Sequence, residues 1–332
     1  MKKINLHSIS IGIALLLLLI LIVMAFMGSL SDAGPVVVAL FALLAFGFNS
    51  YDKLKGYVFT MAIFAGVCLS MYYPQYFTNI GDFKFTALII PLIQIIMFGM
   101  GTSMSVGDFA GIIKTPKGVL IGITAQLAIM PVVGFILAKV SGLPPEIAAG
   151  IVLIGCSPSG VASNVMAYLA NANLALSITI TTVATLLAPL VTPLLMKLFA
   201  GEFIEIDVLG MMWSIIKMII LPIGAGLLFN KLRGDKAKWL DRAMPVVSMI
   251  GIALIIVVIT AAGRDSLLDI GLLLMVIVLV HNVVGYLLGY WFARGMKMSE
   301  RDARTIAIEV GMQNGGLASG IANSLGRIAT MG

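Results

Sequence analysis

Long apolar runs separated by short charged segments recur from one end of the chain to the other. Most runs approach or exceed the roughly 20 residues that a helix needs to cross a hydrocarbon core about 30 Å thick. The runs lack the alternation of β-barrel strands, and backbone groups must be paired in lipid, so the pattern predicts helices. Eleven spans are expected, at residues 11–28, 34–48, 57–74, 85–104, 118–140, 145–169, 173–197, 208–231, 243–262, 268–293 and 302–328. The sequence therefore predicts an all-α polytopic membrane protein.

The composition supports this prediction. Of the 332 residues, 60% are hydrophobic and only 11% are charged, whereas a soluble domain carries about 25% charged residues. The two cysteines, Cys68 and Cys156, both fall inside expected spans, so they indicate no disulfide framework.

The net charge of +6 would suit a nucleic-acid-binding protein, but the distribution of basic residues indicates membrane topology instead. With a cytoplasmic N-terminus, alternate loops carry fifteen basic residues: Lys2, Lys3, Lys53, Lys55, Lys114, Lys117, Lys231, Arg233, Lys236, Lys238, Arg242, Arg294, Lys297, Arg301 and Arg304. The opposite loops carry four: Lys84, Lys139, Lys197 and Arg264. The positive-inside rule then predicts multi-pass insertion in the inner (cytoplasmic) membrane with the N-terminus in the cytoplasm, and no nucleic-acid partner.

Two segments match without gaps at an offset of 156 residues: 155–163 (GCSPSGVAS) and 311–319 (GMQNGGLAS). The identical pairs are Gly155/Gly311, Gly160/Gly316, Ala162/Ala318 and Ser163/Ser319. The same offset maps three earlier spans, 57–74, 85–104 and 118–140, onto 213–230, 241–260 and 274–296. Because the expected topology sends 145–169 and 302–328 across the membrane in opposite directions, we expect two inverted repeats.

Inverted repeats are typical of secondary transporters, although channels and membrane enzymes also contain repeats. We expect the first repeat at 57–197 and the second at 208–332, with residues 1–50 as an additional N-terminal transmembrane hairpin. The second repeat has four spans where the first has five, so we expect a truncated chain that lacks the last helix.

Both matched segments contain helix breakers at membrane depth, Ser157-Pro158-Ser159-Gly160 and Gln313-Asn314-Gly315-Gly316. An unwound segment exposes backbone amides and carbonyls, which membrane proteins tolerate only inside protein or beside a wet cavity. The N-termini of half-helices attract anions, and their C-termini and free carbonyls suit cations. A simple kink would explain one break, but a repeated pair favours a binding site.

Glu309 lies inside the last span, whereas the other acidic residues fall in loops or at span ends. A charge at the bilayer centre costs at least about 2.5–3.5 kcal/mol, so it requires compensation. No basic residue lies nearby in sequence, which predicts a bound cation as its partner; a protonated structural Glu is the alternative.

Several other side chains at membrane depth offer the oxygen ligands that hard cations prefer: Ser163, Asn164, Ser177, Thr181, Gln126 and Gln313. Ser177 and Thr181 are four residues apart and so share one helix face, although each alone often bonds to its own helix. His281 and Lys217 also lie at membrane depth, where a hydrogen-bonded structural His and a snorkelling Lys are the alternatives to a functional role.

Five motifs give the chain a resemblance to a known family: 97–101 (MFGMG), 125–131 (AQLAIMP), 162–169 (ASNVMAYL), 281–282 (HN) and 309–314 (EVGMQN). Over about 57–332 the chain resembles the bile acid:sodium symporter family, in particular the bacterial homologues of the ileal and hepatic bile acid transporters. The resemblance implies ten helices in two inverted five-helix repeats with two crossing broken helices. It also implies a panel domain at 57–104 and 208–262, and a core domain at 118–197 and 268–332.

The resemblance further implies three groups of site residues. Sodium site 1 would use Ser163, Asn164, Ser177, Thr181 and Glu309. Sodium site 2 would use Gln126, Glu309, Val310, Met312 and Gln313, with Val310 and Met312 acting through their carbonyls. The substrate would face Asn314, Ser159 and Gly160. The chain departs from the family in its two extra N-terminal spans, its missing last helix, and Ser159-Gly160-Val161 in place of Gly-Gly-Thr, which removes a hydroxyl near the substrate.

These expectations describe a sodium-coupled symporter that imports a small organic anion, either bile acid-like or a metabolite carboxylate, by alternating access. We expect no enzyme activity and no cofactor besides Na⁺ as the coupling ion. A cation/proton antiporter of related architecture is the first alternative, although such proteins rely on intramembrane Asp residues and none is deep here. The second is an intramembrane serine hydrolase using Ser157 or Ser159 with His281, but the surrounding residues do not complete Gly-x-Ser-x-Gly.

Overall fold

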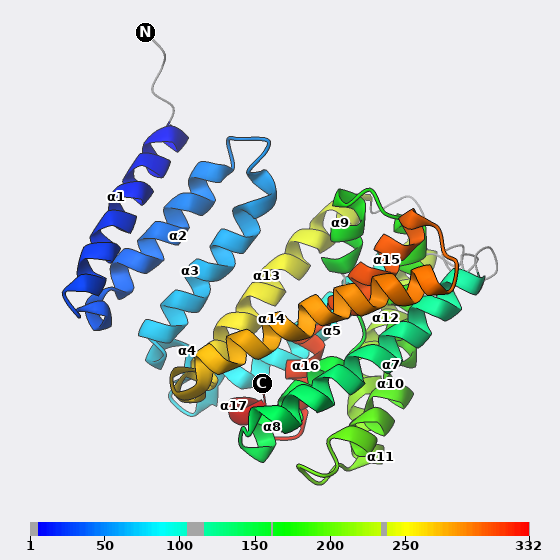
Figure 1. Ribbon diagram of the computed structural model, residues 1–332. Helices are drawn as coiled ribbons and strands as arrows, with labels where there is room; N and C mark the ends of the chain where they lie inside the picture. The colour runs from blue at the N-terminus through cyan, green and yellow to red at the C-terminus, as the bar shows by residue number, and fades with distance from the viewer. Residues whose placement is uncertain (1–5, 105–115, 161, 234–237, 332) are drawn as a thin grey trace. The chain divides into compact units, whose positions relative to one another are not determined.

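The computed structural model describes residues 6–104, 116–160, 162–233 and 238–331 (Figure 1). Over these residues the protein is helical, apart from a short antiparallel hairpin of β1 (Asn79–Ile80) and β2 (Phe83–Lys84). Within the described ranges, eight helical stretches are long and apolar enough to cross a membrane: Leu6–Phe26, Lys55–Tyr72, Phe85–Ser103, Pro116–Ser141, Leu174–Phe199, Val208–Leu232, Ala243–Ala262 and Arg264–Gly295. This all-helical structure is consistent with the predicted polytopic membrane protein.

The chain forms two compact units, of which the first comprises residues 1–88 and 249–264. Its main helices are α1 (Leu6–Phe26), α2 (Gly34–Phe48) and α3 (Val58–Tyr72), followed by α4 (Gln75–Thr78) and the hairpin. In this unit α2 packs against both α1 and α3. Small residues allow the helices to approach: a Cβ at Gly34 would lie 2.8 Å from the ring of Tyr72, and one at Gly47 would lie 2.5 Å from Ile11.

The second unit comprises residues 89–248 and 265–332. It contains α5 (Ile89–Ser103), α7 (Pro116–Ser141), α10 (Leu174–Phe199), α11 (Val208–Ile215), α12 (Leu221–Arg233) and most of α14 (Arg264–Gly295), whereas α13 (Lys238–Ala262) contributes residues to both units. A short π-helical segment, Ile216–Ile220, joins α11 to α12. In this second unit, apolar side chains from α7, α10, α14 and α15 form a hydrophobic core: Val119, Ile121, Ala125, Met130, Leu176, Ile180, Ala293, Ala303, Ile306 and Val310.

Two expected spans of the second unit are broken where the sequence predicts. The first consists of α8 (Pro145–Cys156) and α9 (Ala162–Leu169), and the second of α15 (Glu300–Gly311) and α16 (Gly315–Ser324), which α17 (Ile328–Met331) follows. The two breaks face each other through an antiparallel bridge between Ser159 and Gln313. In it the amide of Gly160 donates to the carbonyl of Met312 at 3.2 Å, and the amide of Asn314 donates to that of Pro158 at 2.9 Å.

The broken helices bring four half-helix ends to one place, the C-termini of α8 and α15 and the N-termini of α9 and α16. In Figure 1 these segments are coloured green for α8 and α9 and orange to red for α15 and α16. The inverted repeat is a statement about symmetry, and the division into panel and core domains is a statement about relative movement. Both stay predictions.

Helices α5 and α12 cross at unusually close range. A Cβ at Gly226 would lie 2.3 Å from the carbonyl oxygen of Phe98, and one at Gly101 would lie 2.3 Å from that of Ile223. We expect Gly226→Ala to lower the melting temperature in detergent, since overpacking of this kind typically costs about 1–3 kcal/mol. Gly224→Ala, two residues away in the same helix, meets no atom within 4 Å and should be neutral. Equal melting temperatures for the two variants would contradict this account of the crossing.

Candidate functional site

Glu309 is completely buried in the last turn of α15, and four hydroxyl groups surround its carboxylate. Oε1 accepts hydrogen bonds from Ser163 at 2.7 Å and from Ser177 at 2.5 Å. Oε2 accepts from Thr181 at 2.7 Å and from Ser159 at 2.5 Å. All four hydroxyl-bearing residues are themselves buried, so water does not replace these contacts.

The local sequence explains why these side chains meet. Ser177 and Thr181 are one turn apart and project from the same face of α10. Asn173 fixes the start of that helix, because its Oδ1 accepts from the amide of Leu176 at 3.2 Å. Ser163 lies in the first turn of α9, directly after the break. The bridge between the two breaks then brings this turn beside the end of α15.

Asn164 completes the group that the resemblance implied for sodium site 1. Its Oδ1 lies 2.8 Å from Ser177 Oγ and 3.3 Å from Thr181 Oγ1. The structure therefore brings together Ser163, Asn164, Ser177, Thr181 and Glu309, and it adds Ser159. We call these six residues the first oxygen group.

The first oxygen group has the chemistry of a site for a small hard cation. Among the described residues, no basic side chain contacts Glu309, and no cluster of three His, Cys, Asp or Glu side chains forms. Glu309 also lies near the negative end of the α15 dipole, which disfavours a carboxylate there and favours a cation. Oxygen-only ligands select hard cations over zinc or copper. A bound monovalent cation would provide the missing positive charge.

A second cluster connects Gln126 of α7 to the residues after Glu309. Gln126 Nε2 donates to Gln313 Oε1 at 2.6 Å and to the carbonyl of Ser157 at 3.2 Å. Gln313 Nε2 in turn donates to the carbonyl of Val310 at 2.6 Å. Main-chain carbonyls only accept, so they fix the orientation of both amides and leave Gln126 Oε1 facing away from them.

Gln126 Oε1 is buried and has no hydrogen-bond partner among the described residues. An unsatisfied buried acceptor is rare in folded proteins and costs about 1–3 kcal/mol. A cation at this point would satisfy it. The structure thus unites Gln126, Gln313 and the carbonyl of Val310, three of the five ligands implied for sodium site 2.

The other two members of sodium site 2 have different contacts. The carbonyl of Met312 accepts from the amide of Gly160, but a carbonyl oxygen has a second lone pair for a cation. The side-chain hydrogen bonds of Glu309 within the described part of the chain all go to the first oxygen group. Gln126, Val310, Met312 and Gln313 form what we call the second oxygen group.

The three residues expected to face the substrate do not behave alike. Gly160 and Asn314 lie at the break and are partly exposed. Asn314 also caps α16, because its Oδ1 accepts from the amide of Leu317 at 3.0 Å. Ser159 is instead buried, and its hydroxyl points to Glu309 rather than to the exposed side of the break.

His281, Lys217 and Ser157 have structural contacts. His281 is buried, and its Nε2 lies 3.1 Å from the carbonyl oxygen of Met130. Lys217 is exposed, and its Nζ lies 5.4 Å from the centre of the Trp213 ring. The hydroxyl of Ser157 donates to the carbonyl of Leu153 in its own helix at 2.9 Å. Neither Ser157 nor Ser159 is hydrogen-bonded to His281 in the described structure, so the nucleophile–base pair of a serine hydrolase is not formed.

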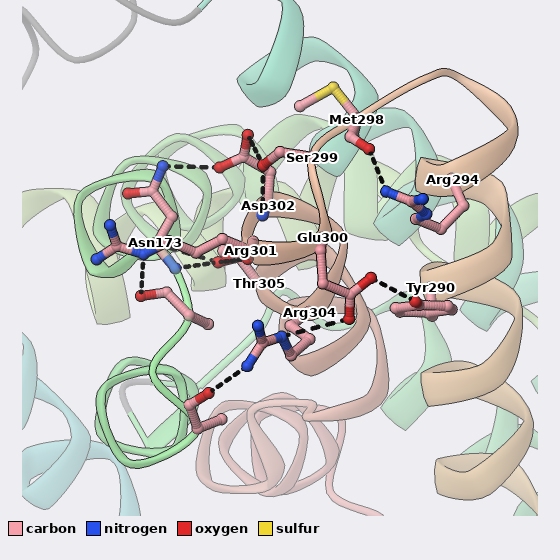
Figure 2. Close-up of polar contacts among 12 residues, drawn as sticks. Asn173, Tyr290, Arg294, Met298, Ser299, Glu300, Arg301, Asp302, Arg304 and Thr305 are labelled. Atoms are coloured by element: carbon pink, nitrogen blue, oxygen red, sulfur yellow. Dashed lines mark hydrogen bonds and ion pairs between the residues drawn. The ribbon is translucent and has the colours of Figure 1, made fainter.

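Sequence reasoning missed a polar network that fastens the turn between α9 and α10 to α15 (Figure 2). The amide of Asn173 donates to Thr305 Oγ1 at 2.7 Å, and its side chain donates to Asp302 at 2.8 Å. Arg301 and Arg304 donate to the carbonyls of Ala172 and Ala170. Thr305 lies one turn before Glu309, and Asn173 lies one turn before Ser177. These spacings of four residues were the signal in the sequence from which the network could have been predicted. The network holds both partners of the Ser177–Glu309 contact in register.

Apolar spanning helices, two facing breaks and buried oxygen groups beside them define a membrane transporter that binds a cation. The profile of the Sodium Bile acid symporter family matches residues 90–270, more than half of the chain. The chain is 42% identical over 273 residues to the uncharacterized sodium-dependent transporter YocS of Bacillus subtilis, covering 82% of this chain and 84% of that protein. The chain belongs to the sodium bile acid symporter family, and it is a sodium-coupled transporter rather than an enzyme.

More distant relatives include organellar and animal proteins. The ileal sodium/bile acid cotransporter of Mus musculus is 32% identical over 236 residues, covering 69% of this chain and 67% of that protein. The probable sodium/metabolite cotransporter BASS1 of Arabidopsis thaliana, a chloroplastic protein, is 34% identical over 222 residues. That alignment covers 67% of this chain but only 55% of the relative. These relatives place the chain in the same family as sodium-dependent cotransporters of bacteria, plants and animals.

Proposed function

We propose that the protein imports a small organic anion together with Na⁺ by alternating access. The observation that carries this proposal is the fully buried carboxylate of Glu309, surrounded by four hydroxyl groups and by no basic side chain among the described residues. A bound cation would compensate the charge of a carboxylate in such a position. A gradient of that cation then provides the driving force for uptake.

The relatives support the choice of ion and substrate class. The names of the Bacillus subtilis, mouse and Arabidopsis thaliana relatives all specify sodium, and the mouse and plant names specify bile acid and metabolite cotransport. The bacterial relative also supports a cell-membrane location for this chain, with the cytoplasmic N-terminus that its basic loops predict. We infer an anionic substrate, either bile acid-like or a metabolite carboxylate.

The geometry suggests how ion binding prepares the anion site. Na⁺ in the first oxygen group would hold α9, α10 and α15 together, and Na⁺ in the second would hold α7 against the second break. The bridge between Ser159 and Gln313 would then fix the N-termini of α9 and α16. These helix ends favour negative charge, so the anion would bind there beside Gly160 and Asn314. Without Na⁺ the breaks are less ordered and the anion binds weakly.

The melting temperature in detergent across a NaCl titration tests this function, with KCl keeping the ionic strength constant. Binding to the folded state stabilises it by RT ln(1 + [L]/Kd), which is about 2.7 kcal/mol at 100 times Kd. We expect a saturable rise that Na⁺ produces and K⁺ does not, followed by a further rise with one member of a panel of organic anions only when Na⁺ is present. A flat response to Na⁺ would refute sodium coupling through these groups.

A further inference from the structure

Ser159 occupies a different place from the other residues at the break. Its side chain is completely buried, and its hydroxyl donates to Glu309 Oε2 at 2.5 Å. The Ser159 Oγ also lies 3.4 Å from Thr181 Oγ1. Its neighbour Gly160 is partly exposed. The Ser159 hydroxyl therefore belongs with the buried oxygens around Glu309 and points away from the region where an anion would bind.

The backbone of Ser159 connects to the second oxygen group. Ser159 pairs with Gln313 in the bridge between the two breaks. The side chain of Gln313 accepts from Gln126, whose own oxygen has no partner in the described structure. The Ser159 side chain thus contacts Glu309, while the main-chain groups on either side of it, the carbonyl of Pro158 and the amide of Gly160, bond to Asn314 and Met312. A shift of Ser159 would move atoms at both groups.

We propose that Ser159 is a sodium ligand of the first oxygen group and that it links the two groups. This inference rests on the proposed function, because it assigns a residue to the same ion site. A serine hydroxyl that donates its hydrogen to a carboxylate retains lone pairs for a hard cation beside that carboxylate. Loss of the hydroxyl removes one oxygen ligand and weakens the coupling of the two groups.

The ligand role separates from a purely structural role by its effect on ion affinity. A structural hydrogen bond stabilises the protein equally in NaCl and in KCl. A ligand changes the Na⁺ concentration at half-maximal stabilisation, and a threonine that keeps the hydroxyl preserves it. Sulfur is a soft ligand that hard cations avoid, so a cysteine of similar shape should behave like an alanine.

The experiment measures the melting temperature of the full chain in detergent against NaCl, with KCl keeping the ionic strength constant. For Ser159→Ala and Ser159→Cys we expect the half-maximal Na⁺ concentration to rise about ten- to a hundredfold, the usual range for residues that support a metal site. Ser159→Thr should stay near the unsubstituted protein. Ser157→Ala is the matched control, since Ser157 is also buried beside the same break but its hydroxyl donates to the Leu153 carbonyl rather than to Glu309.

An unchanged half-maximal Na⁺ concentration in Ser159→Ala and Ser159→Cys would overturn the proposal, even if both variants melt at lower temperature in KCl. An equal shift in Ser157→Ala would also overturn it, because the effect would then belong to the break as a whole. If Ser159→Ala does not fold, Ser159→Gly tests the same loss of the hydroxyl. A flat Na⁺ response of the unsubstituted protein would instead refute the proposed function itself.

Discussion

Glu309→Gln will abolish the sodium-dependent rise in melting temperature and sodium-driven uptake, while the variant stays folded. The amide has the shape of the carboxylate but no charge, and its NH₂ group can only donate toward hydroxyls that now donate to Oε2. Two unit charges about 4 Å apart interact by about 4 kcal/mol at an effective dielectric constant of 20, which is roughly a thousandfold in affinity. In KCl the variant should be at least as stable as the unsubstituted protein, because a buried charge without a counter-ion is removed.

The measurement is the NaCl titration of melting temperature, supported by uptake of the anion that the screen identifies. Glu202→Gln is the matched control: Glu202 is exposed and forms a surface ion pair with Lys139 at 3.3 Å. Surface pairs of this kind contribute little to stability, so the control should keep its full sodium response. A normal sodium response in Glu309→Gln would show that the cation binds elsewhere.

Much of this architecture was predictable, because hydrophobic length and helix breakers act locally. The expected span at 173–197 corresponds to α10 at Leu174–Phe199, and the span at 118–140 corresponds to α7 at Pro116–Ser141. The span at 145–169 is broken between Cys156 and Ala162, where Ser157-Pro158-Ser159-Gly160 predicts it. Proline and glycine disrupt helices through their own backbones, so a single sequence suffices to place these breaks.

The grouping of distant residues was a different problem. That Ser177 and Thr181 share a face follows from helical spacing, but their contact with Glu309 depends on how three helices pack. The internal match and the family resemblance provided that information, and periodicity did not. Ser159 shows the limit, since a side chain in an unwound segment has no repeating direction. The sequence therefore identified it as a polar residue at the break but not which way its hydroxyl points.

Gln126→Ala will reduce the cooperativity of sodium binding. Gln126 Oε1 is the buried acceptor without a partner among the described residues, and a cation there would satisfy it. Removing the side chain also leaves Gln313 Oε1 without the donor at 2.6 Å, so the second oxygen group loses both an oxygen and its order. The first oxygen group does not contain Gln126 and should keep its ion. We expect the Hill coefficient of the sodium response to fall from about 2 toward 1, and the half-maximal concentration to rise about ten- to a hundredfold.

Gln94→Ala is the matched control for Gln126→Ala, because Gln94 also lies inside a spanning helix and its Nε2 donates to a main-chain carbonyl, that of Lys217, at 3.1 Å. It should keep both the Hill coefficient and the half-maximal concentration. If Gln126→Ala keeps them as well, the second oxygen group binds no sodium, and the unpartnered oxygen then has a purely structural explanation. If sodium binding is lost altogether, as expected for Glu309→Gln, the two groups bind only together. That outcome would make the bridge between Ser159 and Gln313 the element through which each ion depends on the other.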